Sequence, residues 1–447
     1  MIKRINRYRE SLLLLTLFLL AFLVRVGVGF LQDSSFWVQA DVTFWNIAKN
    51  LVESGEYSLS AGVPTILRAP AYPLLLALFY WLFDSNHHLL IAANSLVNTA
   101  VVVLTYFLGR LIFGRQVGVV AACLVAFYPY LVWQSHHMID TGLLSLLALA
   151  LVYAILKAET SGRLRWVVVA AVMGGMAFLT RSVVILFVAA VPFWWFWANR
   201  KRNPRLGAHI LLFFAVLVLC VLPWVIRNAV VFDRLVLTES PVGGQNLWRG
   251  NNPLIFSIYP EHSVDSFWPY ESRLLRPYAA DPFQSNNWYV RQAIDYIVAH
   301  PVIFACNTLR KAILFYDWDL VPRSRQNAVV DGVTGAVLQH GPSRPLAERI
   351  IYTSSYVAIV ILAAGGLPRA WRANRQATLL AGLLFVSWTL LHAIMVPVTR
   401  YRMPLEPFLI IWSAYGFCLV FSSSLEARVV ARWPLLASRL CGGVSKK

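Results

Sequence analysis

Long uninterrupted apolar runs constrain this chain more than any other feature of its sequence. Several reach the roughly 20 residues that an α-helix needs to cross a bilayer. Of the 447 residues, 58% are hydrophobic and only 13% are charged, which excludes a soluble globular protein. The candidate spans are residues 11–31, 88–110, 116–134, 141–157, 165–180, 183–198, 206–226, 350–367, 377–397 and 404–424. The sequence therefore predicts an all-α polytopic membrane protein with about ten transmembrane helices.

The first of these runs raises a separate question, because basic residues precede it as they do in a signal peptide. Residues 11–31 form a longer apolar stretch than such a peptide needs, and no clear small-residue cleavage site follows it. We therefore expect it to be retained as the first membrane helix.

Basic residues predict how the chain is oriented in the membrane. They gather in short clusters next to the spans, and these clusters hold the whole formal net charge of +18. The positive-inside rule then predicts that both termini are cytoplasmic. A strongly basic chain can also bind nucleic acid, but clusters placed beside spans indicate topology and contact with anionic lipids, so no nucleic-acid partner is expected. The clusters lie at the N-terminus, 109–115, 157–165, 199–205, 369–375 and the C-terminus.

The same topology divides the chain into three regions. Residues 1–226 form an N-terminal transmembrane catalytic module with a first external loop at 32–87, residues 227–348 form a large external loop region, and residues 349–447 hold the C-terminal helices and cytoplasmic tail. Inside the first loop, residues 42–53 have the apolar periodicity of a helix lying on the membrane, ended by Gly55. The apolar run 70–83 is too short to cross and is expected at the interface or as a re-entrant segment.

This first external loop also carries the residues that indicate chemistry. Asp41 precedes the amphipathic helix, and the stretch LRAPAYP supplies Arg68 and Tyr72. An acid and a guanidinium at the outer membrane surface suit a reaction on a lipid-linked phosphate. Two alternatives remain open: Asp41 is also a good N-cap for a helix beginning at Val42, and Arg68 could extend to the interface simply to solvate its charge.

Further stretches follow in a characteristic order. They are GRLIFG, LTRS, PWVIRN, GGQNLWRGNNP and RYRMPLEPFLIIWSAYG, and they spread over most of the chain. Together with Asp41 and LRAPAYP, this pattern resembles the GT-C superfamily of integral-membrane glycosyltransferases, and within it the bacterial protein O-mannosyltransferase and aminoarabinose transferase type.

The resemblance implies an inverting transfer of a sugar from a polyprenyl-phosphate donor to an acceptor hydroxyl, on the periplasmic face of the bacterial inner membrane. It implies that Asp41 is the base and that Arg68 contacts the lipid phosphate. Arg181, Arg400 and Arg402 fall at the outer ends of spans, where guanidinium groups can hold a phosphate. Each arginine is alternatively a topology anchor or an ion-pair partner, for example of Glu406. No cofactor is expected, and the acceptor is a lipid, a glycan or a protein.

The second external loop departs from the family pattern. Where the family usually has a glutamate after a small polar residue, the stretch HHMIDTG offers Asp140, with His137 just before it. Asp140 is expected to orient the acceptor, to position Arg181 or to act as a second acid, and His137 is a candidate substrate contact or a plain loop residue. A metal held by Asp41, Asp140 and His137 is a further alternative, but the spacing matches no established ligand motif, so no metal is predicted.

The stretch GGQNLWRGNNP has two interpretations. Its glycines and Asn-Pro pair are typical of turns, whereas Asn246 and Trp248 are residue types that hydrogen-bond and stack on a sugar ring. Two rival functions also remain: an O-antigen ligase or polymerase using pyrophosphate-linked glycans, and a lipid or glycan transporter. Transporters usually show repeated halves, and the absence of duplication in this sequence favours an enzyme.

Overall fold

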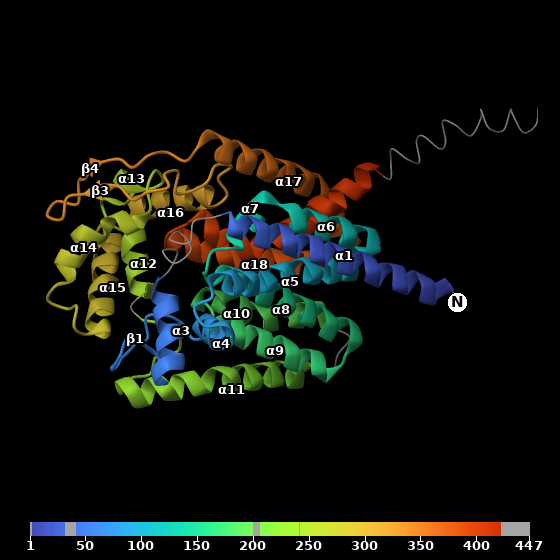
Figure 1. Ribbon diagram of the computed structural model, residues 1–447, viewed down its shortest axis with the longest axis horizontal. Helices are drawn as coiled ribbons and strands as arrows, with labels where there is room; N and C mark the ends of the chain where they lie inside the picture. Colours follow the sequence, from blue (N-terminus) through green and yellow to red (C-terminus); the bar gives the residue numbers. More distant parts are fainter. Residues whose placement is uncertain (1, 32–41, 200–205, 241, 422–447) are drawn as a thin grey trace, which may run out of the picture.

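A computed structural model of the chain describes residues 2–31, 42–199, 206–240 and 242–421. Figure 1 shows long helices lying side by side along the long axis, with a cap of shorter elements at one end of this bundle. The N-terminus and the end of the last described helix lie at the opposite end. The molecule therefore has a helical bundle and a cap, and the two meet at a junction.

Within the described residues, ten apolar helical segments of the bundle each coincide with one of the ten predicted spans. Seven of the described helices are long and apolar enough to cross a membrane, or eight if the bent pair α15–α16 counts as one span. The prediction of an all-α polytopic membrane protein is confirmed. The segments are α1 (Ile2–Phe30), α5 (His87–Phe113), α6 (Arg115–Phe127), α8 (Thr141–Ser161), α9 (Leu164–Phe178), α10 (Ile185–Asn199), α11 (Leu206–Phe232), α17 (Leu346–Ala373), α18 (Arg375–Ile394) and Thr399–Phe421, which opens with the 3-10 helix η3 (Thr399–Leu405).

The third predicted span is broken, because proline disrupts the helix there. α6 ends at Phe127, and the short helix α7 (Pro129–Gln134) begins at Pro129, which has no N–H to continue the ladder. The break leaves carbonyls at the end of α6 without helical partners. Arg25, buried in α1, donates to the carbonyls of Val125 (3.0 Å) and Ala126 (2.9 Å). This arginine inside a span therefore satisfies backbone groups that the break exposes.

Glycines allow the bundle helices to approach one another closely, as is common in membrane proteins. A Cβ on Gly118 of α6 would lie 2.7 Å from the carbonyl oxygen of Tyr106 in α5. Likewise, a Cβ on Gly366 of α17 would lie 2.4 Å from the carbonyl oxygen of Trp412. Larger side chains at these two positions would force the helices apart.

The segment between α1 and α5 has the helix that its periodicity predicts. α3 (Val42–Ser54) ends before Gly55, whose φ of +73° is the left-handed conformation that favours glycine. Its apolar face packs on α4 (Ala71–Phe83) through Phe44 and Ala48, so protein rather than lipid covers that face. Between the two helices, β1 (Ser58–Ser60) and β2 (Val63–Pro64) form a short antiparallel pair.

The long segment between α11 and α17 is folded and forms the cap. Its helices pack around two apolar clusters, one of which contains Trp248 and Tyr289. The turn interpretation of GGQNLWRGNNP is wrong for most of that stretch, because residues 242–250 form a helix. The elements are α12 (Val242–Gly250), α13 (Ile255–Ile258), η2 (Val264–Phe267), α14 (Trp268–Leu275), α15 (Pro282–Ala299), α16 (Pro301–Phe315) and the antiparallel strands β3 (Val329–Val330) and β4 (Val337–Gln339).

Candidate active site

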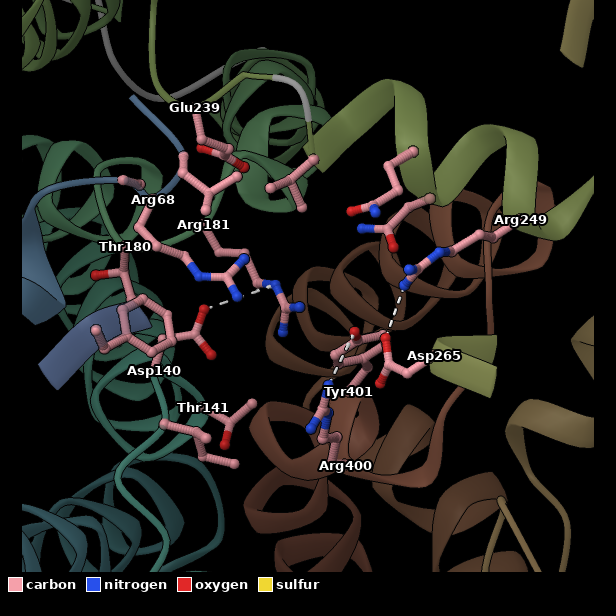
Figure 2. Close-up of a pocket in the computed structure, with 17 residues that line it drawn as sticks. Arg68, Asp140, Thr141, Thr180, Arg181, Glu239, Arg249, Asp265, Arg400 and Tyr401 are labelled. Carbon is pink, nitrogen blue, oxygen red and sulfur yellow. Dashed lines mark hydrogen bonds and ion pairs between the residues drawn. The ribbon is translucent and has the colours of Figure 1, made fainter. Parts of the chain in front are cut away.

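A polar cavity lies at the junction of bundle and cap (Figure 2). Its volume is about 130 Å3, and four arginines and three carboxylates line it beside neutral polar residues. This volume is below the 300–1,000 Å3 of most small-molecule pockets, which suits a compact charged group better than a whole headgroup. The charged lining residues are Arg68, Arg181, Arg249, Arg400, Asp140, Glu239 and Asp265.

Arg68 reaches this cavity from the segment between β2 and α4. Its Nε donates to Oγ1 of Thr43 at 2.9 Å, and its guanidinium carbon lies 4.9 Å from the centre of the Phe44 ring. The backbone is held as well, because the Tyr57 hydroxyl donates to the Arg68 carbonyl (2.9 Å). α3 and the loop before α4 thus hold the position of this guanidinium.

Asp140 and Arg181 form an ion pair on the same side of the cavity (Figure 2). Asp140 immediately precedes α8, and Arg181 follows the end of α9; Oδ2 of Asp140 lies 3.8 Å from Nε of Arg181. The guanidinium carbon of Arg181 also lies 4.1 Å from the centre of the Tyr401 ring. A carboxylate and a ring therefore hold Arg181 from two directions. Of the roles predicted for Asp140, positioning Arg181 matches this geometry.

Arg400 approaches the cavity from η3 and shares Tyr401 with Arg181. Its Nη2 donates to the Tyr401 hydroxyl at 3.5 Å, and its guanidinium carbon lies 5.2 Å from the ring centre. The Tyr401 backbone carbonyl accepts from the indole Nε1 of Trp388 in α18 at 2.9 Å. One tyrosine thus keeps two guanidinium groups close to each other, and the bundle holds that tyrosine.

Arg249 is a charged lining residue that the sequence did not single out. It belongs to α12 of the cap, and its guanidinium lies 2.7 Å from a carboxylate oxygen of Asp265 and 2.7 Å from one of Glu271. Glu271 is fully buried and also accepts from Gln245 at 2.6 Å. Partial dehydration would raise the pKa of Asp265, but Arg249 and Arg400 outweigh that effect and hold the pKa of this carboxyl below its ordinary value.

The structure brings five of the ten predicted site residues into this cavity: Arg68, Asp140, Arg181, Asn246 and Arg400. A sixth, His137, lines an adjoining cavity. Asp41, the predicted base, lies outside the described residues, although Thr43 and Phe44, which follow it closely, contact Arg68.

The other three residues are buried elsewhere. Tyr72 packs against Phe44 and donates to Oδ1 of Asn94 at 3.4 Å. Trp248 packs among aromatic rings of the cap and is only 6% exposed, so it does not present a face to a sugar. Arg402 is 1% exposed, and its Nε donates to Glu406 at 2.8 Å. Its other nitrogens donate to the carbonyl of Phe315 and the hydroxyl of Tyr352, so the ion-pair alternative describes Arg402, and it lines neither the cavity nor its neighbour.

The described residues offer little to a metal ion. Among residues 2–31, 42–199, 206–240 and 242–421, no group of three or more His, Cys, Asp or Glu side chains has a suitable arrangement. Asp140 already faces the guanidinium of Arg181. The chemistry of this lining is that of an anion site, since guanidinium groups bind phosphate oxygens through paired hydrogen bonds.

Part of the chain matches a known protein family. Residues 67–226 match the family model described as dolichyl-phosphate-mannose-protein mannosyltransferase. No curated protein sequence matches the chain.

Two solved structures share its fold at low sequence identity. They are ArnT from Cupriavidus metallidurans in the apo state, with a TM-score of 0.53, 13% identity and 99% of this chain covered, and the oligosaccharyltransferase AglB from Archaeoglobus fulgidus in complex with an inhibitory peptide and a dolichol-phosphate, with a TM-score of 0.57, 13% identity and 95% covered. The chain spans 66% of the ArnT chain and 52% of the AglB chain. Residues 67–226 are therefore similar to this mannosyltransferase family, and the chain as a whole shares the fold of ArnT and AglB.

Proposed function

We propose that this protein moves a sugar from a polyprenyl-phosphate donor to an acceptor hydroxyl on the external face of the bacterial inner membrane. The observation that carries the proposal is the small cavity at the junction of bundle and cap, lined by four arginines. A polyprenyl-phosphate donor presents its phosphate at the membrane surface, and its isoprenoid tail stays in the bilayer. The dolichol-phosphate bound by AglB supports a donor of this class.

The proposed reaction is a single displacement. The acceptor oxygen attacks the anomeric carbon, the bond from that carbon to the phosphate oxygen breaks, and the phosphate leaves with the electron pair. Arg68, Arg181 and Arg400 stabilise the charge that develops on this phosphate, so the leaving group needs no proton. Asp41 accepts the acceptor's proton as the new bond forms. One displacement inverts the anomeric configuration, and no metal or cofactor takes part.

The orientation proposed here puts both termini in the cytoplasm and the cap in the periplasm. Basic clusters that the positive-inside rule assigns to the cytoplasm lie next to one another in the fold. Arg110 of the 109–115 cluster pairs with Glu10 near the N-terminus. Gln376, beside the 369–375 cluster, donates to the carbonyl of Ala198, which precedes the 199–205 cluster. These contacts support one basic face of the bundle, away from the cap.

This orientation has a direct test, because Cys306 of α16 is exposed and free. A membrane-impermeant maleimide should label Cys306 in cells whose outer membrane alone has been made permeable, and Cys306→Ser should abolish that labelling. Labelling of Cys306 only after the inner membrane is opened would reverse the orientation.

The function is tested by measuring transfer from a panel of radiolabelled polyprenyl-phosphate sugars into cell-envelope acceptors, with purified protein in nanodiscs. Wild-type protein should transfer at least one sugar, and Asp41→Asn should lose that transfer. Asp84→Asn is a matched control, since Asp84 is exposed in the same loop region and has a φ of +52° that asparagine tolerates. Full activity of Asp41→Asn would remove Asp41 as the base. Transfer from pyrophosphate-linked donors alone would favour the ligase alternative, and no transfer by folded protein would favour a transporter.

A further inference from the structure

A second and larger cavity adjoins the small one. Its volume is about 740 Å3, and it lies within the 300–1,000 Å3 range of small-molecule sites. The two cavities share part of their lining, so a molecule bound in one would lie next to a molecule bound in the other. The shared residues are Ile139, Asn246, Arg249, Asp265, Arg400 and Tyr401.

Two arginines line only the larger cavity, and a single carboxylate serves both. Arg325 donates from Nε to Oε2 of Glu348 at 2.9 Å, and Arg344 donates from Nη1 to Oε1 of the same carboxylate at 2.8 Å. Glu348 lies in the first turn of α17, where a carboxylate also interacts favourably with the helix dipole. Two guanidinium groups with one carboxylate leave an excess positive charge at this wall.

Arg344 is fixed in the cavity wall, whereas Arg325 is more open. Arg344 also donates from Nε to the carbonyl of Pro322 at 2.9 Å, and its side chain is 19% exposed. The side chain of Arg325 is 47% exposed. A guanidinium held in the wall beside a more exposed one can bind an anion that enters the cavity, because the held one is already oriented.

The remaining lining suits a saccharide. Trp133 and Tyr130 supply aromatic rings, and Gln134, Asn246 and Asn327 supply amide groups. The Arg325 guanidinium carbon lies 5.9 Å from the centre of the Trp133 ring, so the cation and the ring face the same space. Aromatic faces cover the apolar side of a sugar ring, and amides hydrogen-bond its hydroxyls.

We infer that the larger cavity holds the acceptor, and that this acceptor is a saccharide head carrying an anionic group that Arg344 and Arg325 bind. The inference rests on the proposed function, because the acceptor hydroxyl must reach the sugar of a donor whose phosphate occupies the small cavity. Arg400 and Tyr401 line both cavities, so the acceptor and the donor would meet beside these two residues. Phosphate and carboxylate groups share the required chemistry, and the experiment separates them.

Binding is measured by saturation-transfer NMR with the protein in phosphatidylcholine nanodiscs, preloaded with polyprenyl phosphate to fill the small cavity. The probes are glucose, glucose 6-phosphate and glucuronic acid. We expect at least one anionic probe to bind about tenfold more tightly than glucose, since a charge-assisted hydrogen bond is worth more than a neutral one. Preference for the phosphate or for the carboxylate identifies the anionic group.

Variants connect that preference to the two arginines. The preference is the dissociation constant of glucose divided by that of the anionic probe. Arg344→Gln should reduce this ratio to near one. Arg344→Lys should keep part of the preference, because lysine retains the charge but not the paired donors. Arg276→Gln, at an exposed arginine of the cap that lines neither cavity, should keep the whole preference. Melting temperatures of all variants separate misfolding from lost recognition.

Equal binding of glucose and both anionic probes, or an unchanged preference in Arg344→Gln, would overturn the inference. This failure is distinct from failure of the proposed function, because binding is measured without transfer. Sugar transfer to a neutral acceptor with no gain from an anionic group would leave the glycosyltransferase proposal intact and remove the acceptor class inferred here.

Discussion

The carboxylate of Asp140 lies 3.8 Å from Nε of Arg181, at the point where the ends of two neighbouring bundle helices meet. Arg181 also faces the Tyr401 ring, so its guanidinium is held from two sides. In the proposed reaction this arrangement makes Asp140 a positioning residue, which would act on the donor phosphate through Arg181.

Asp140→Asn should therefore weaken donor binding more than it slows the chemical step. We expect the donor KM to rise about tenfold while kcat changes less, because asparagine retains the shape but loses the charge that orients Arg181. Steady-state transfer assays at varied donor concentration measure both constants. A loss of kcat of about 1,000-fold at unchanged KM would instead make Asp140 a proton-transferring group.

Substitution of Arg402 should affect stability and not donor binding, although Arg402 lies only two residues from Arg400. Arg402→Gln would leave Glu406, which is fully buried, without its cation, and breaking such a pair costs about 3–5 kcal/mol. The melting temperature should fall clearly, while the folded fraction keeps the donor affinity of wild type. The double variant Arg402→Gln/Glu406→Gln should recover part of the stability, because no unpaired charge remains. Loss of donor affinity without loss of stability would instead support the hypothesis that Arg402 binds the phosphate.

The contrast between Arg400 and Arg402 shows where prediction from sequence ends. Both arginines stand at the predicted outer end of the same span, so on the sequence both fit the phosphate hypothesis equally well. In the 3-10 helix η3, with about three residues per turn, residues two apart point in different directions. Only the packing of η3 against the bundle decides that Arg400 and Tyr401 line the cavity while Arg402 is buried.

The cap was harder to predict than the bundle for a related reason. Long apolar runs indicate spans directly, so the bundle helices were predicted near their observed positions. Glycines within α12 and an Asn-Pro pair just after it concealed a short helix, since both are typical of turns. Once residues 242–250 are helical, Asn246 and Arg249 lie three residues apart on one face, and both line the cavity. Trp248 lies off that face and packs into the cap.

Lys311 joins the end of α12 in the cap to the end of α18 in the bundle. This buried lysine donates to the carbonyls of Gly250 (2.8 Å) and Ile394 (2.9 Å) and to Oδ1 of Asn251 (3.2 Å). Lys311→Met should lower the melting temperature and increase proteolysis of the cap, because buried acceptors left unpaired cost about 1–3 kcal/mol each. Leu309→Met, at an exposed position of the same helix, is the control. Unchanged proteolysis in Lys311→Met would mean that other contacts hold the cap.

His137 should give the protein a defined acid sensitivity. Burial, helped by the adjacent His136, lowers the pKa of His137 from its ordinary 6.5 to about 3, so the folded protein keeps this imidazole neutral. Above pH 6.5 the group is neutral in both states and does not change the free energy of unfolding. As the pH falls from about 6.5 toward 3, the unfolded chain binds a proton that the folded protein does not, so the free energy of unfolding decreases. His137→Asn should therefore show a smaller fall in melting temperature between pH 7.5 and 5.5 than wild type. His300→Asn, at an exposed histidine, is the control and should keep the wild-type fall in melting temperature. If His137→Asn showed the same fall as wild type, the folded protein would not hold His137 in its neutral form.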